Sequence, residues 1–381
     1  MSTPSYGVEQ IGAIIAEVTF DTDVAFTTDN GIGFTSVKIT PKLDFQAYKE
    51  HTGSASLQGE HKGKQGGDFE IEGYLKPNGA ATAPDCGPLL IAAGFTYDGG
   101  IYTLNTSQPS SLQFARKAGA SLFEKINGLF ISQIEIELAG SQPAMFRARG
   151  SFASYGALFG NPTTNSASYL AGVTAISLAA DDAYKIRPGV RVAFGSEDNT
   201  AAGYLVTAVA SNGTGLTISP ALANGIGTSQ AITVVFPTVA PEGTIVGGVE
   251  DALTVDSTSV GFISHKVVVD TGIHGLDKEA SANRINRLAR GARSVTTESQ
   301  FYFLDENVAY LGKAWNGSTR DMIARAGADT AGVRIKVDTP AVRLGVAELD
   351  LPEADEAVYT SQGVARREGT TNETEIAIDT N

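Results

Sequence analysis

Cysteine, long apolar runs and enzyme motifs are scarce or absent in this chain of 381 residues. Its single cysteine, Cys86, excludes an intramolecular disulfide and a zinc site built from several cysteines. No run approaches the roughly 20 apolar residues that a membrane helix needs, and the first residues, MSTPSYGVEQ, lack the basic start and apolar core of a signal peptide. Since 42% of the residues are hydrophobic, we expect a folded protein with no membrane contact and no export by a signal peptide.

Motifs of the common enzyme classes are also missing. No Gly-x-Ser-x-Gly elbow, P-loop or dinucleotide-binding fingerprint occurs. His51 and His61 lie in a Gly- and Lys-rich segment, while His265 and His274 flank a strand-like run, so none has the i, i+4 spacing of a helical metal pair. The carboxylates of PEADEA (352–357) lack the spacing of a calcium loop. We predict no catalytic residue, no metal site and no cofactor.

Positive charge is in deficit, with 28 Lys and Arg against 42 Asp and Glu, and the deficit is uneven. Residues 1–160 carry 11 basic against 16 acidic residues, residues 161–241 carry 3 against 4, and residues 242–381 carry 14 against 22. The segments GNPTTNSAS and PTVAPEG border the nearly uncharged middle part. We therefore predict two similar flanking domains, 1–160 and 242–381, with an inserted domain at 161–241.

A phrase of the first flank recurs in the second. DVAFTTDNGIGFTSVKI (23–39) returns as DALTVDSTSVGFISHKV (251–267), 228 positions later (251 less 23). The identical pairs are Asp23 with Asp251, Gly33 with Gly261, Phe34 with Phe262, Ser36 with Ser264 and Lys38 with Lys266. Similar elements follow in similar order, which favours duplication of one domain over coincidence.

Both flanks have the pattern of β-sheet proteins. DFEIEGYL (68–75) and QIEIEL (133–138) alternate apolar residues with carboxylates, as strands with one wet face do. Each flank also offers one helix, at 83–95 with Asp85 as N-cap and at 305–317. The predicted fold is mainly β, with two β-sandwich or barrel domains that each carry one flanking helix.

The predicted insert has a regular spacing of short strand-like segments that differs from the flanks. AISLA, RVAFG, YLVTAVA, GLTIS and AITVVF are short strand-like segments separated by Gly, Asn and Pro turns. Spacings of eight to twelve residues are typical of a small β-barrel or sandwich. We predict a small all-β domain at 161–241.

A basic segment stands out in this acidic chain. Arg284, Arg287, Arg290 and Arg293 fall at every third residue, and in a helix they would form one stripe. Nucleic acid and an acidic neighbouring subunit are both suitable partners, and a solvated loop is the alternative. The first flank has a basic loop with Lys62 and Lys64 at the equivalent place. Two copies in a negatively charged protein favour contact with a neighbouring subunit over DNA.

Several segments of the first flank resemble the tail tube (major tail) protein of long-tailed, non-contractile bacteriophages. They are GGDFEIEGYLKPNG, PDCGPLLIAAGF, YTLNTSQPSSLQFARKAGA and GLFISQIEIELAGSQPAMFRARGSFASYG. The second flank is similar in GVEDALTVDSTSVGFISHKVVVDTG. The resemblance implies a non-enzymatic virion protein whose sheets join around rings, whose long loops reach the next ring, and whose stacked rings carry the genome into the host.

The resemblance also implies partners and a location. The chain would bind itself, the tape measure protein and double-stranded DNA inside the channel without sequence recognition, and the tail terminator and tail tip proteins. It would be assembled in the host cytoplasm and reside in the virion tail, with the insert facing outward. Two tube domains per chain predict trimeric rings with pseudo-sixfold symmetry, and hexameric rings are the alternative.

Five carboxylates are predicted to line the channel: Asp68, Glu70, Glu72, Glu135 and Glu137. An acidic wall would repel phosphate and keep DNA from adhering. Lys62, Lys64 and the four arginines of 284–293 are predicted to contact an adjacent ring. Two other functions stay open: a virion surface or decoration protein that presents the insert, and an enzyme, such as a carbohydrate-active one, with an unrecognised carboxylate pair.

Overall fold

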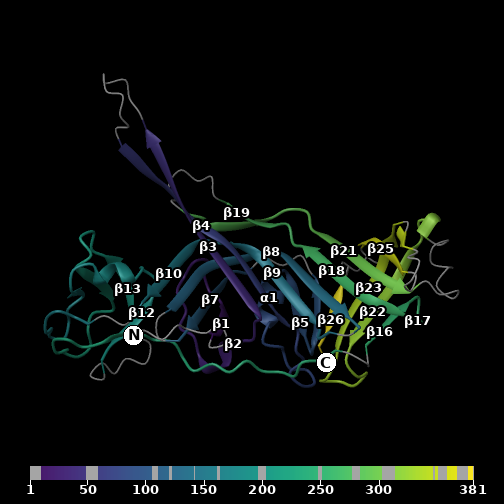
Figure 1. Ribbon diagram of the computed structural model, residues 1–381, viewed down its shortest axis with the longest axis horizontal. Helices are drawn as coiled ribbons and strands as arrows, with labels where there is room; N and C mark the ends of the chain where they lie inside the picture. Colours follow the sequence, from purple (N-terminus) through teal and green to yellow (C-terminus); the bar gives the residue numbers. More distant parts are fainter. Residues whose placement is uncertain are drawn as a thin grey trace.

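The computed structural model describes residues 10–48, 59–104, 110–119, 122–140, 142–160, 164–195, 203–247, 251–276, 284–302, 314–345, 348–350, 358–366 and 376–380. The molecule is elongated and is built almost wholly of antiparallel strands, which confirms the mainly β prediction (Figure 1). In the part of the chain that is described, no helix is long and apolar enough to cross a bilayer.

Strands fall into three groups along the chain. The first repeat contains β1 (Gln10–Ala16), β2 (Gly31–Ile32), β3 (Ser36–Tyr48), β4 (Gly59–Tyr74), β5 (Phe95–Asp98), β6 (Ile101–Leu104), β7 (Leu112–Ala118), β8 (Leu122–Ala139), β9 (Met145–Phe152) and β10 (Ser154–Phe159). The small sheet contains β11 (Ala175–Ser177), β12 (Arg191–Phe194), β13 (Tyr204–Val209), β14 (Gly215–Ser219) and β15 (Ile232–Val234). The second repeat contains β16 (Ala252–Val255), β17 (Thr258–Val260), β18 (Phe262–Asp270), β19 (Ile273–Leu276), β20 (Arg287–Arg290), β21 (Ser294–Tyr302), β22 (Thr319–Ala326), β23 (Ile335–Leu344), β24 (Glu348–Asp350), β25 (Val358–Ala365) and β26 (Ala377–Asp379).

The predicted alternation of β4 and β8 is confirmed. Phe69 and Ile71 are buried in the core, whereas Glu70 and Glu72 between and after them are half-buried on the other face. Apolar side chains on one pleated face drive this burial, since removing apolar surface from water contributes about 25 cal/mol per Å². The opposite face is left for polar contacts.

The two repeats share one scheme of strand pairing. In the first repeat the pairs are β1–β2, β1–β7, β7–β8, β8–β9, β9–β4, β4–β3 and β8–β10. In the second repeat the corresponding pairs are β16–β17, β16–β22, β22–β23, β23–β25 with β24–β25, β25–β21, β21–β18 and β23–β26. The shared pairing scheme therefore extends well beyond the repeated phrase.

The residues that lie opposite each other in paired strands also correspond between the two repeats. Lys38 lies opposite Glu70, and 228 residues later (266 less 38, 298 less 70) Lys266 lies opposite Glu298. From β23 to β25 the shift is 213 (348 less 135, 360 less 147), because Glu135 lies opposite Arg147 as Glu348 lies opposite Thr360. Even a register break recurs, between Leu112 and Phe114 and between Arg320 and Met322.

One match of the repeated phrase is wrong. Asp23 lies in the long connection from β1 to β2, whereas Asp251 directly precedes β16, which is the counterpart of β1. The second repeat replaces this connection by the turn at Asp256 and Ser257, so the equivalence begins only at β2 and β17. A constant offset cannot follow such a change in loop length.

The two repeats are joined through their sheets. β8 of the first repeat pairs with β18 of the second over seven residues, from Gln133 opposite Asp270 to Ala139 opposite Ser264. A continuous sheet in the order β3–β4–β9–β8–β18–β21–β25 results. Buried residues of both repeats form one hydrophobic cluster, which includes Ile136 and Val267.

The predicted first helix exists as α1 (Gly87–Ala92) and is shorter than expected. Its N-cap is Cys86, and the chain leaves it at Gly94, whose φ of +96° suits glycine. The carboxylate of Asp85, the expected N-cap, accepts a hydrogen bond from the Gly33 N–H at 2.9 Å and pairs with the Lys76 ammonium at 2.9 Å. Most of the second predicted helix lies outside the described residues, and only 314–315 are seen as helical.

The small sheet has the strand order β11–β14–β13–β12–β15 and lies at one end of the molecule (Figure 1). Its core includes Ile176, Val192 and Tyr204, and it also packs against Phe123 and Leu158 of the first repeat. The strands of this sheet lie inside the predicted insert, 161–241, whose limits stay a prediction.

Candidate functional site

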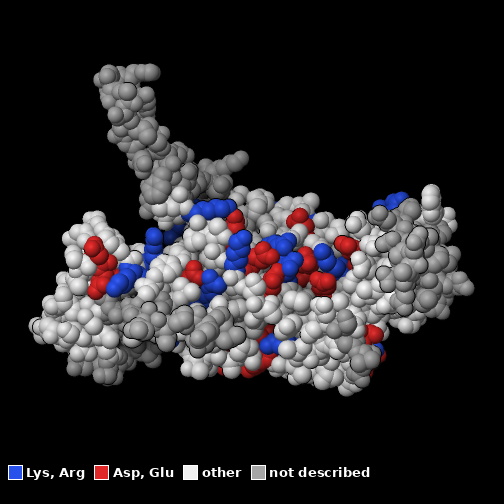
Figure 2. Space-filling view, viewed as in Figure 1, with Lys and Arg blue, Asp and Glu red and all other residues white. Residues whose placement is uncertain are grey.

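A broad charged face covers the large sheet where the two repeats meet (Figure 2). Alternation along β4 and β8 brings all five predicted carboxylates to this face, the side opposite the core. β9 lies between these two strands and adds Arg147 and Arg149. The face is therefore a mixed array and not an acidic one.

Ion pairs run across the strands of this face. Arg147 pairs with Glu72 and lies 3.5 Å from Glu135, measured between Nη1 and Oε1. Arg149 Nη2 lies 3.2 Å from Glu70 Oε1. Hydrogen bonding to Glu72 raises the pKa of the Arg147 guanidinium, so it stays charged at every physiological pH.

The ion pairs continue to both sides of β9 and β8. Lys42 on β3 pairs with Asp68, and Lys266 on β18 lies 3.6 Å from Glu135. On the five strands β3, β4, β9, β8 and β18 the face thus carries five basic against six acidic side chains, which leaves a net charge of −1: Lys38, Lys42, Arg147, Arg149 and Lys266 against Asp68, Glu70, Glu72, Glu135, Glu137 and Asp270. The pairing of β9 between β4 and β8, which cannot be seen in the sequence, adds two arginines to the predicted carboxylates, and the place of these residues in a channel stays a prediction.

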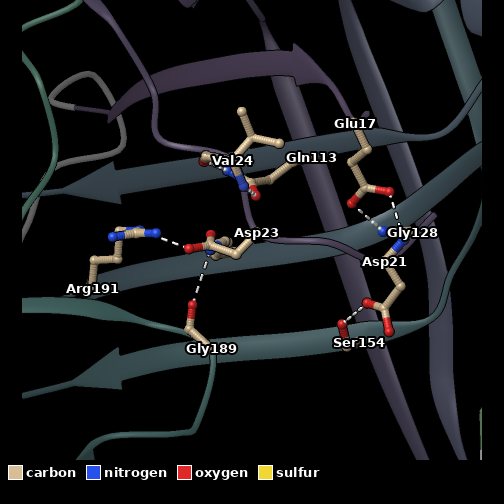
Figure 3. A network of polar contacts seen from close by, with 10 residues as sticks. Glu17, Asp21, Asp23, Val24, Gln113, Gly128, Ser154, Gly189 and Arg191 are labelled. Atoms are coloured by element: carbon tan, nitrogen blue, oxygen red, sulfur yellow. Dashed lines mark hydrogen bonds and ion pairs between the residues drawn. The ribbon is translucent and has the colours of Figure 1, made fainter. Parts of the chain in front are cut away.

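A second polar cluster lies where the first repeat contacts the small sheet (Figure 3). Asp23 pairs with the ammonium of Lys125 and with Arg191 Nε, the latter at 2.6 Å. Lys125 also donates to the Gly189 carbonyl at 3.0 Å. Burial lowers the pKa of Lys125, and the nearby Asp23 carboxylate opposes this effect. Partners from two sheets therefore share one desolvated ion cluster.

Glu17 and Asp21 extend this cluster (Figure 3). The carboxylate of Glu17 accepts hydrogen bonds from the N–H of Gly128 at 2.7 Å and of Asp21 at 2.8 Å. Asp21 has a left-handed φ of +57° and accepts a hydrogen bond from the Ser154 hydroxyl. Burial raises the pKa of both carboxyl groups. Beyond the charge of its members, no pattern in the sequence predicts this cluster.

The basic segment is not helical. Arg287 and Arg290 lie in β20, which pairs with β19, so residues three apart alternate between faces instead of forming a stripe. Arg284 Nε lies 2.9 Å from Asp21 Oδ2 of the same chain. Arg290 packs beside Gly94, where an added Cβ would meet its Nη2 at 2.6 Å. This segment crosses the first repeat of its own chain, and its contact with an adjacent ring stays a prediction.

The equivalent basic loop of the first repeat is also extended. Lys62 and Lys64 lie in β4, where it pairs with β3 beyond the body of the sheet, and their side chains lie outside the described residues. β3 and β4 form an arm that projects from the molecule (Figure 1). The inter-ring role of these lysines stays a prediction.

A shallow hollow of about 540 Å³ lies on the same face of the second repeat. Its charged lining residues include Lys266, Glu298, Arg343 and Arg366. Across the described residues, no group of three or more His, Cys, Asp or Glu side chains could hold a metal ion. The geometry of the described strands offers open sheet edges and a charged surface.

Comparison with known proteins adds no relative: no family model matches the chain, and no curated protein matches its sequence.

Proposed function

We propose that this protein is the structural subunit of the tail tube of a long-tailed, non-contractile bacteriophage. The observation that carries the proposal is the joint between the repeats. Two domains of one topology are connected edge to edge by β8 and β18, which is how neighbouring subunits of a β-walled ring would be connected. The chain thus already contains one contact of the kind that a ring repeats.

Ring closure follows from the energetics of sheet edges. An open edge exposes unpaired N–H and C=O groups and promotes association, whereas closure into a barrel leaves no edge. Each chain supplies two equivalent domains, so three chains would occupy six equivalent positions. We therefore expect trimeric rings with pseudo-sixfold symmetry, and stacked rings would form the channel through which the genome passes.

The charged face fits the wall of such a channel. Its arginines are engaged by carboxylates of adjacent strands, so few cations are available to hold phosphate. Passage of DNA past such a wall requires no repulsion, only the absence of strong contacts. Tape measure protein and DNA inside the tube, and terminator and tip proteins at its ends, are the partners of this proposal.

Electron microscopy of the purified protein tests the proposal. We expect rings or tubes in which each ring contains three chains and six similar lobes. Rings of six chains would contradict the trimeric assembly, and a protein that stays monomeric at all concentrations would contradict the tube.

The small sheet supports a second candidate function, a virion surface or decoration protein. It lies at one end of the molecule, and its hydrophobic cluster is separate from that of the large sheet, as a presented module would require (Figure 1). The two functions differ in assembly, because a decoration protein binds preformed particles and forms no tubes by itself. Binding to purified virions without self-assembly would favour this alternative.

A further inference from the structure

The joined sheet ends in β3 on one side and in β24, beside β25, on the other. These two strands are the counterparts of β18 and β8, which pair with each other inside the chain. β3 is the counterpart of β18, and β24 is the counterpart of the part of β8 that pairs with β18. Within the described residues, β3 pairs with β4 alone and β24 pairs with β25 alone. The chain therefore ends in two complementary edges whose equivalents are already joined.

We infer that β3 of one chain pairs with β24 of a second copy, antiparallel, with Lys38 opposite Asp350 and Thr40 opposite Glu348. The register follows from the internal joint, where Lys266 lies opposite Glu137 and Val268 opposite Glu135. Subtracting 228 from the β18 positions and adding 213 to the β8 positions gives the new partners. The inference rests on the proposed self-assembly, and it holds for any ring or filament of this chain.

Residue types at two of the three paired positions agree with this register. Lys266 and Glu137 become Lys38 and Asp350, again a basic residue opposite an acidic one. Val267 and Ile136 become Ile39 and Leu349, again two apolar residues.

Burial identifies what the β3 edge lacks. Val267 is fully buried between β8 and β21, whereas its counterpart Ile39 is only partly buried although it packs on the same hydrophobic cluster. Lys38 is exposed, and its counterpart Lys266 is half-buried. A neighbouring strand along β3 would complete the burial of Ile39, as β8 does for Val267.

Engineered disulfides test the register. Opposed Cα atoms in antiparallel strands lie about 4.5–5.5 Å apart, within the range that a disulfide bridges. The native Cys86 is buried and does not interfere. We expect the full-length chain with Lys38→Cys and Asp350→Cys to form covalent oligomers on oxidation, which end at three chains if rings are trimeric.

The matched control carries Lys38→Cys with Leu349→Cys, which places the thiols on opposite faces and should stay monomeric on a non-reducing gel. An equimolar mixture of the two single variants should give only two-chain products. Rings that form without a disulfide between positions 38 and 350 would overturn the register and leave the proposed tube function standing. Covalent chains that run past three would support the register and contradict trimeric closure, while absence of both rings and bonds would overturn both proposals.

Discussion

The two repeats share their strand pairing but differ in their outer edges and arms. β18 is covered on both sides, by β21 and β8, whereas β3 has a described partner on one side only. Core residues on and beside these strands differ as well: His265 and Ser299 of the second repeat stand where Val37 and Ile71 stand in the first. The two repeats therefore keep one pattern of sheet and differ at its edges.

The arms show the same divergence. β3 runs on without a break to Tyr48 and projects from the body (Figure 1). In the second repeat the chain turns at Gly272, whose φ is +65°, after the Thr271 hydroxyl has donated to the Ile131 carbonyl at 2.7 Å. β19 and β20 then fold back along the first repeat. One arm therefore contacts its own chain, whereas the other projects from it.

Equivalent apolar positions at the two edges should respond very differently to a charge. We expect Val267→Asp to lower the free energy of unfolding by about 4 kcal/mol or more, because the carboxylate would be buried without a partner. Ile39→Asp should cost less than half as much, since that site is partly open, and should abolish assembly. Urea denaturation measures the first effect and sedimentation velocity the second.

The two aspartate variants test whether the β3 edge is open in the isolated chain and used in assembly. Equal losses of stability would show that the β3 edge is already covered in the isolated chain. Normal assembly of the Ile39→Asp variant would show that the edge is not used. Ile39→Val serves as the control, because it restores the residue type of the second repeat and should leave both measurements near wild type.

Strand pattern predicted the sheets well, because period-two alternation is a local property of the chain. β9 matches the strand-like run MFRARGSF, and the strands of the small sheet fall on the five segments named for it. Which strands become neighbours is set by contacts between residues far apart in sequence. The arginines of β9 were therefore missed as partners of Glu70 and Glu72.

The conformation of long connections was the second feature that the sequence pattern could not predict. The connection 17–30 carries Glu17, Asp21 and Asp23, and nothing in its composition indicated that it folds inward against the small sheet. The arginines would form a stripe only in a helix, spacing alone does not exclude a strand, and the pairing of β19 with β20 decides the conformation. Non-local contacts overrode the local pattern in both cases.

His265 should make the second repeat acid-sensitive where the first is not. Complete burial lowers its pKa from 6.5 to about 4, so the folded chain holds a neutral imidazole while the unfolded chain takes up a proton below about pH 6.5. Stability from this group is full above pH 6.5 and falls as pH drops toward 4, by up to about 3 kcal/mol. Its neighbours across the strands are Leu138 and Ser299, and Ser299 Oγ lies 2.8 Å from Nδ1.

The double variant His265→Val with Ser299→Ile copies the first repeat and removes this contribution. We expect its free energy of unfolding to vary less between pH 6.5 and 4.5 than that of the wild type, measured by urea titration at each pH. Buried carboxyls such as Glu17 and Asp21 titrate in both proteins, so the difference isolates the histidine. Identical pH profiles would exclude it as the cause.

The folded-back arm depends in part on the ion pair of Asp21 with Arg284. We expect Asp21→Asn to cost about 1 kcal/mol, because the Arg284 guanidinium is half exposed and solvent screens the pair. Asparagine tolerates the left-handed backbone at this position, so the change isolates the charge. Amide hydrogen exchange should become faster in β19 and β20.

A double-mutant cycle with Arg284→Gln separates the ion pair from other effects of either change. Strict additivity of the two losses would show that the pair contributes no coupling and that other contacts hold the arm. A coupling of a few tenths of a kcal/mol or more would assign part of the arm's position to this contact.

The smallest effect on stability is expected on the charged face, where the effect on function should be large. Lysine at Glu70, Glu72 and Glu137 would change the net charge of the face from −1 to +5, leave Arg149 without its carboxylate partner and leave Arg147 with the buried Glu135 alone. The three replaced carboxylates are half-buried or exposed, and pairs of that kind contribute only about 0–1 kcal/mol each, so rings should still form. If this face lines the channel, the released cations should bind phosphate and slow DNA delivery, most strongly at low salt.

The transposed variant Arg147→Glu with Glu72→Arg keeps both the net charge and a salt bridge, and it should deliver DNA at the wild-type rate. Virions carrying each variant can be compared by the rate of DNA release in vitro. Normal release by the lysine variant at low salt would place this face away from the DNA path.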